Sequence, residues 1–198
     1  MSYEEWGPLA NLIGTWESGL TGLDISFHND IGEMATTPYS EKSSFVGFGP
    51  VDNGVQVLYG LDYRRAVFAE GSEKPLHMEV GYWMWDAVER QVFRCFNIPR
   101  GQAVMAGGTV QPGSSSFRLQ AELGSKCYGI LSNHYLEKVA RATRFDVTVM
   151  VENSSFSYDE TTTVDYMMSS TVILHTDRNT LTRVNSSAET GLRDVALR

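Results

Sequence analysis

Cysteine is rare in this sequence and long apolar runs are absent. Only Cys95 and Cys127 occur among its 198 residues, too few for a zinc site built from cysteine pairs, so we expect both to be free thiols. No apolar run approaches the roughly 20 residues that a membrane-spanning helix needs. Residues 1–5 contain two acids and lack the basic region of a secretory signal peptide. The sequence therefore predicts no membrane partner and a location in the reducing cytoplasm.

Basic side chains are also scarce. The chain has 16 Lys and Arg against 24 Asp and Glu, a formal net charge of -8 at pH 7. This charge repels phosphate groups and no cluster of Lys and Arg offsets it, which argues against nucleic acid as a partner. A hydrophobic share of 42% supports a sizeable core at this length. We expect a single domain over residues 1–186 and a C-terminal tail over 187–198, where periodicity is weak.

The motifs of common enzyme classes are missing. None of the 4 histidines belongs to an HExxH or HxH pair, so metal ligands adjacent in sequence are not expected. There is no GxSxG nucleophile motif, and Gly107-Gly108-Thr109 does not extend to the GxGxxG of dinucleotide-binding folds. The sequence alone leaves open whether the protein is an enzyme.

Strand alternation is the dominant pattern. Val55, Val57, Tyr59, Leu61 and Tyr63 fall on one face of a predicted strand. Similar runs follow at 81–85, 92–98, 103–110, 116–123, 144–151, 156–164 and 180–185, separated by turn-forming Asn, Asp, Gly and Pro. Because such short links cannot carry a parallel return, the sheet is predicted to be antiparallel.

The number of strands favours a closed sheet. About ten strands are more than an open twisted sheet holds without curling. We therefore predict an all-β fold, an antiparallel up-and-down barrel of about ten strands, similar to calycins and lipocalins. Two short helices accompany it. One is amphipathic and lies within 3–13, and the other begins at the N-cap Asn133 and covers about 133–142.

Two histidines are candidates for a site inside the barrel, which either fills with side chains or encloses one small ligand. His77 shares a strand face with Glu79 and with Gly81, which would leave a gap for a flat ligand. His175 ends an apolar run at the barrel rim, where its imidazole could bind a metal while Asp177 or a carbonyl holds the other ring nitrogen. The plain alternatives are a His77 bonded to a neighbour and a His175 in a solvent-facing turn.

Three stretches form an ordered set. They are 12–19 (LIGTWESG), 74–82 (KPLHMEVGY) and 175–183 (HTDRNTLTR). The first is similar to the Gly-Thr-Trp opening of the nitrobindin family, the second to its Lys-Pro-x-His-x-Glu-x-Gly strand, and the third to its final strand, where a histidine is followed by a segment ending in Arg or Lys. Together they resemble that family of heme-binding β-barrels over about residues 9–185.

The resemblance implies a heme site. One heme b would lie at the barrel mouth with His175 as the iron ligand, given one residue inserted in the turn after it. His77 would be a cavity residue near the heme, and Trp16 would belong to the barrel floor. The heme-contacting threonine would be Thr37 or its neighbour Thr36. Members of the family bind nitric oxide and are described as isomerising peroxynitrite to nitrate.

Two other functions remain open. A carrier of a fatty acid or other apolar small molecule needs the same cavity without heme. For it, Arg118, Arg144 and Arg183 are candidates to contact a carboxylate, since all three lie in predicted strands. A barrel filled by side chains would instead act through its surface, for example as a homodimer.

Overall fold

The structure is a computed structural model that describes residues 3–167 and 172–184. The predicted tail at 187–198 lies outside these residues, so its conformation stays a prediction. The described elements are η1 Tyr3–Leu12, β1 Gly14–His28, β2 Glu33–Asp52, β3 Val57–Ala69, β4 His77–Asp86, β5 Gln91–Ile98, β6 Gln102–Thr109, β7 Ser116–Leu123, β8 Gly129–Ser132, α1 His134–Val139, β9 Ala140–Val151, β10 Ser155–Tyr166 and β11 Val172–Arg183.

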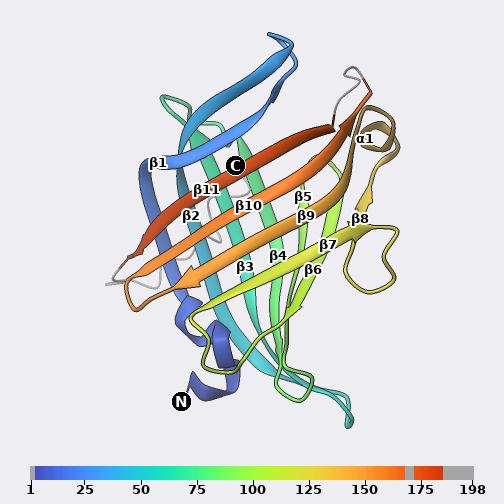
Figure 1. Ribbon diagram of the computed structural model, residues 1–198. Coiled ribbons are helices and arrows are strands. Elements are labelled where there is room, and N and C mark those ends of the chain that lie inside the picture. Colours follow the sequence, from blue (N-terminus) through green and yellow to red (C-terminus); the bar gives the residue numbers. More distant parts are fainter. Residues whose placement is uncertain (1–2, 168–171, 185–198) are drawn as a thin grey trace.

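The strands close into one barrel (Figure 1). Around it the order is β1, β11, β10, β9, β7, β8, β6, β5, β4, β3 and β2, and β2 pairs with β1 again. Strand alternation sorts side chains into inner and outer positions, as on β2, where Tyr39, Glu41, Ser43 and Phe45 are all buried. The predicted all-β barrel is confirmed.

The prediction of a wholly antiparallel sheet is wrong at β8. This short strand runs parallel to β7 although only residues 124–128 separate the two. The rule that parallel strands need a long crossover fails here because the link folds back along the end of β7, where the amide of Glu122 donates to the carbonyl of Tyr128 (3.1 Å). As a result, β8 lies between β6 and β7 at one end of these strands.

Both predicted helices are present. The side-chain oxygen of Asn133 accepts hydrogen bonds from the backbone N–H groups of Tyr135 and Leu136, as expected of an N-cap. Helix α1 then ends at Val139, earlier than predicted, because β9 begins directly after it. The N-terminal helix η1 is a 3₁₀ helix interrupted at Gly7, where φ is 51°.

The barrel interior has three layers. The end covered by η1 is filled with apolar side chains, among them Trp6, Leu9, Trp16, Phe45 and Trp85. The middle layer is charged. Beyond it, at the end of the barrel where α1 lies (Figure 1), the side chains leave a cavity. The middle layer consists of the buried side chains of Glu41, Arg65, Glu79, Arg94 and Glu160.

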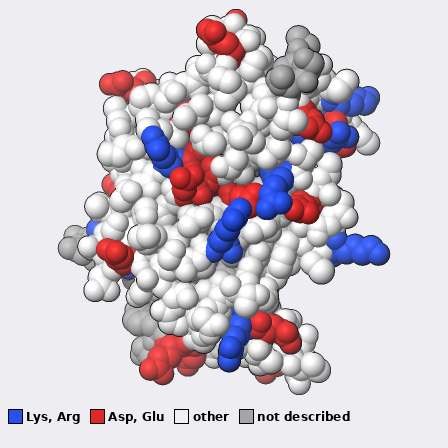
Figure 2. All heavy atoms as spheres, viewed as in Figure 1, with Lys and Arg blue, Asp and Glu red and all other residues white. Residues whose placement is uncertain are grey.

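The outer surface in Figure 2 carries acidic and basic side chains next to each other. Strands β7 and β9 contribute such pairs, with Arg118 Nη2 2.5 Å from Asp146 Oδ1 and Arg144 Nη1 2.6 Å from Glu122 Oε1. Mixed charges of this kind give little field of one sign on this face. None of the described helices is long and apolar enough to cross a membrane.

Candidate functional site

A cavity of about 610 Å³ occupies the open end of the barrel. Its volume falls in the range of ligand pockets, about 300–1,000 Å³. The charged layer forms its floor. Its rim consists of the β1–β2, β3–β4 and β5–β6 turns and of α1. A barrel filled throughout by side chains is therefore not what the sequence forms.

The cavity has two walls of opposite character. The polar wall comes from β1 and β11 and contains Asp24, Ser26, His28, His175 and Asp177. The other wall, from β5, β6, β8, α1 and β9, is apolar and aromatic. An apolar ligand with one polar or metallic centre suits such a pair of walls. The apolar wall contains Phe96, Ile98, Val104, Ile130, Leu136, Val139, Ala142 and Phe145.

His175 lines the cavity from β11, between two carboxylates. Its Nε2 lies 2.5 Å from Asp24 Oδ2 and 3.0 Å from Asp177 Oδ2. Asp24 pairs with Asp177 across β1 and β11, so alternation turns both carboxylates and His175 to the same inner face. No hydrogen bond or ion pair of the second nitrogen, Nδ1, occurs among the described residues. Histidines that bind metals usually have this arrangement, with one nitrogen held by a carboxylate.

The two carboxylates change the charge of the ring. Burial alone would lower the pKa of His175, but its hydrogen bonds to Asp177 and Asp24 raise the pKa to about 10. Burial would raise the pKa of Asp24, and the hydrogen bonds from His175 and Ser26 lower it instead. The ring is thus an imidazolium at neutral pH, and metal binding to it would release a proton.

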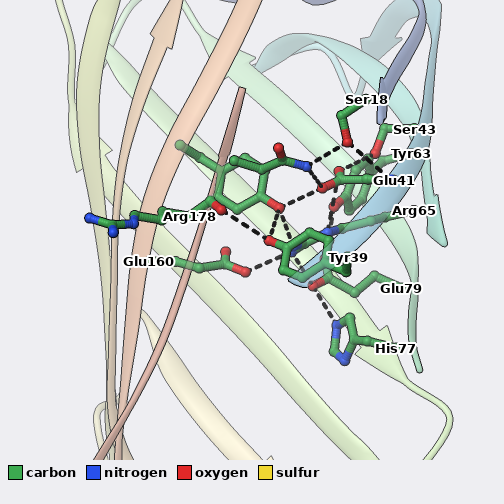
Figure 3. Close-up of polar contacts among 12 residues, drawn as sticks. Ser18, Tyr39, Glu41, Ser43, Tyr63, Arg65, His77, Glu79, Glu160 and Arg178 are labelled. Carbon is green, nitrogen blue, oxygen red and sulfur yellow. Dashed lines mark hydrogen bonds and ion pairs between the residues drawn. The ribbon is translucent and has the colours of Figure 1, made fainter. Parts of the chain in front are cut away.

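The floor of the cavity is a network of buried charges (Figure 3). Arg65 lies 3.3 Å from Glu41, 3.2 Å from Glu79 and 2.6 Å from Glu160. Arg94 contacts Glu79 and Glu160 as well. Such charges are tolerated away from water because each has partners of opposite sign. The hydroxyl groups of Tyr39, Tyr63 and Tyr158 complete the network.

His77 lies at the cavity end of this network, below Glu79 in Figure 3. Its Nε2 is 2.9 Å from Glu79 Oε1. Burial alone would raise the pKa of Glu79, but Arg94 and Arg65 hold it well below its usual range. His77 is therefore both a cavity residue and the partner of a neighbouring carboxylate. Its contact with heme stays a prediction.

The other two predicted site residues lie farther from the cavity. Trp16 is fully buried in the apolar layer, where its indole Nε1 donates to the carbonyl of Leu12 at 2.7 Å. The charged layer separates it from the cavity. Thr37 is half-buried on β2, and its hydroxyl lies 3.4 Å from Nε2 of His28, which itself lines the cavity. Thr36 is exposed.

The three arginines predicted to contact a carboxylate do not line the cavity. Arg118 and Arg144 lie on the outer face and pair with Asp146. Arg183 packs over the ring of Trp16, 4.2 Å from its centroid, at the closed end of the barrel. Alternation alone did not indicate which face of these strands points inward.

Gly81 leaves no space for a ligand. A Cβ at this position would lie 1.9 Å from the carbonyl oxygen of Cys95 and 2.7 Å from Cα of Phe96. The expected gap is filled by the backbone of β5, so the glycine serves the close approach of two strands.

Comparison with known families identifies this architecture. The sequence profile described as "THAP4-like, heme-binding beta-barrel domain" matches residues 5–183. This chain belongs to that family. The THAP4-like barrel is also similar to the crystal structure of Rv2717c from M. tuberculosis, with a TM-score of 0.61 and 18% identity over 89% of this chain and 95% of that chain. At this identity the likeness concerns the fold. No curated protein sequence matches the chain.

The residues of this THAP4-like barrel fit a heme. The cavity has the volume of a ligand pocket and an apolar wall for the porphyrin. His175 offers an imidazole with Nε2 already held by carboxylates. These features are properties of the chain itself and do not depend on the family match.

Sequence reasoning missed Asp24 and most of the charged layer. Tyr39, Glu41 and Ser43 were a usable signal, since they lie at every second position before Phe45 and so share its inner face. Charged residues on an otherwise apolar face are candidates for a buried network.

Proposed function

We propose that this THAP4-like barrel binds one heme b in its cavity, with His175 as the ligand of the iron. The observation that carries the proposal is the imidazole of His175 on the polar wall, opposite an apolar wall and held at one nitrogen by Asp24 and Asp177. Membership of a heme-binding family supports it independently.

Each part of the cavity has a role in this proposal. When bound, heme would supply an iron that binds nitric oxide and isomerises peroxynitrite to nitrate, as the resemblance to nitrobindins implies. Asp24 and Asp177 orient the ring of His175 through Nε2. The apolar wall excludes water from one side. His77, held by Glu79, keeps a second imidazole in the cavity on β4.

Titration of the purified apoprotein with hemin tests the proposal. We expect a sharp Soret band that saturates at one equivalent of hemin. His175→Ala should abolish it, while His134→Ala, which removes an exposed histidine at the start of α1, should leave it unchanged. An identical Soret band in wild type and His175→Ala would overturn the assignment of the ligand.

The reaction itself needs a second measurement. In stopped-flow mixing, the hemin-loaded protein should accelerate the decay of peroxynitrite and raise the yield of nitrate over nitrite. His175→Ala should lose both effects. If wild type binds no hemin, mass spectrometry of material extracted from natively purified protein tests the alternative, a carrier of an apolar small molecule.

We also propose that the protein works in the cytoplasm. Cys95 and Cys127 are both free thiols, as expected from their number, which suits a reducing compartment.

A further inference from the structure

One arginine lies at the rim of the cavity. Arg100, in the β5–β6 turn, is the one Lys or Arg among the described residues that line it. Its side chain is exposed at the rim and makes no hydrogen bond or ion pair within the described part of the chain. By contrast, Arg65, Arg94 and Arg144 are each held by carboxylates. Arg100 therefore has a guanidinium group free to bind a ligand that enters the open end of the barrel.

The backbone of Arg100 is fixed, although its side chain is exposed. Nδ2 of Asn133 donates to the carbonyl of Arg100 at 2.7 Å, and the amide of Asn133 donates to the carbonyl of Gly101 at 2.9 Å. The same asparagine caps α1. One residue thus ties the turn to the helix, so the guanidinium starts from a fixed point on the rim.

Apart from Arg100 and the imidazolium of His175, which Asp24 and Asp177 already neutralise, the acidic side chains among the described residues of the cavity repel an anion. Asp24, Asp30, Glu79, Glu160 and Asp177 are carboxylates that line it. A ligand with its own carboxylate is therefore disfavoured in every orientation except those that place this group in water or at Arg100.

We infer that Arg100 binds the carboxylate of the cavity's ligand and so fixes the orientation in which an apolar acid enters. The inference rests on the cavity being the ligand site proposed above. Two kinds of ligand carry such a carboxylate: heme b, which has two propionates, and a fatty acid. A bidentate guanidinium–carboxylate pair is directional as well as attractive, so it selects one edge of a flat ligand.

Ligands with esterified carboxylates distinguish loss of the guanidinium–carboxylate pair from other effects of the substitution. Hemin and hemin dimethyl ester are titrated into wild type, Arg100→Gln and the control Arg90→Gln, which removes an exposed arginine that does not line the cavity. We expect Arg100→Gln to weaken hemin binding about three- to tenfold and to leave the dimethyl ester unaffected. Arg90→Gln should bind both as wild type does. Raising the salt concentration should weaken hemin binding to wild type more than to Arg100→Gln.

The results distinguish failure of the inference from failure of the heme proposal. Equal hemin affinity in wild type and Arg100→Gln, or an equal loss for the ester, would overturn the role of Arg100 while heme binding stands. If wild type binds no hemin, oleate and methyl oleate are compared by calorimetry. A loss confined to oleate in Arg100→Gln would support the inference and refute the heme proposal. Binding of neither ligand to wild type would refute both.

Discussion

The charge of His175 depends on carboxylates from two neighbouring strands. Asp24 comes from β1 and Asp177 from β11, and strand pairing brings both carboxylates to the same ring nitrogen, Nε2. The ion pair between His175 and Asp24 thus joins β11 to β1, the two strands that form the seam where the barrel closes. A single residue carries both the proposed ligand role and a share of the stabilisation of that seam.

The stability contributed by His175 should depend on pH. Its pKa in the folded protein is about 10, raised from 6.5, so the folded state binds the proton more tightly. The stabilisation is then fully present below pH 6.5, declines above it, and is lost as the pH passes 10. Urea unfolding of wild type and His175→Gln from pH 6 to 10.5 measures this as the difference in unfolding free energy.

His175→Gln is the reference for wild type, because the two proteins differ in a single titrating side chain. We expect wild type to lose its advantage over the variant as the pH rises. A difference that stays constant over this range would show that folding does not raise the pKa of the ring. The lowered pKa of Asp24 has the opposite effect in acid: below pH 3.8, its ordinary pKa, stability falls as this carboxylate is protonated.

At the scale of elements, the charged layer joins strands that are distant in sequence. Arg65 on β3 contacts Glu41 on β2, Glu79 on β4 and Glu160 on β10. Since β10 lies across the barrel from β3, these contacts cross the interior. The network supports the cavity floor, because the side chains of Glu79 and Glu160 are also part of the lining.

Removing one member of this layer should be costly. Arg65→Met removes the basic partner of Glu41 and leaves Glu79 and Glu160 with Arg94 alone, so we expect it to lower the unfolding free energy by about 3–5 kcal/mol. Arg118→Met breaks a pair with Asp146 on the outer surface and should cost less than about 1 kcal/mol. Urea unfolding of both variants checks the contrast. Equal losses would mean that the network contributes no more than a surface pair.

Sequence patterns predict where helices and strands lie better than they predict which strands pair. Alternation and turn residues located most strands, and Asn133 marked the start of α1 because capping is local. The long strands β1 and β2 were not predicted, and β8 was missed because four residues carry too little alternation. Its parallel pairing with β7 depends on a loop hydrogen bond that no pattern indicates. The role of Gly81 likewise depends on how closely β5 approaches.

At the scale of the whole molecule, strand number predicts closure but not the cavity. Whether a barrel is hollow depends on how far its inner side chains fill it, and here the filling changes from aromatic to charged to empty along the axis. The inner or outer position of Arg118, Arg144 and Arg183 could not be predicted for the same reason. A one-residue change in register reverses every side chain of a strand, and only the folded barrel fixes it.

Because the cavity forms only in the folded barrel, ligand binding should stabilise the whole fold. Hemin at 100 times its dissociation constant is expected to raise the unfolding free energy by about 2.7 kcal/mol. The unfolding midpoint in urea, followed by tryptophan fluorescence or circular dichroism, should therefore rise with hemin concentration in wild type and stay fixed in His175→Ala. A Soret band without any shift of the midpoint would mean that hemin binds the unfolded chain equally well, and that the barrel is not its site.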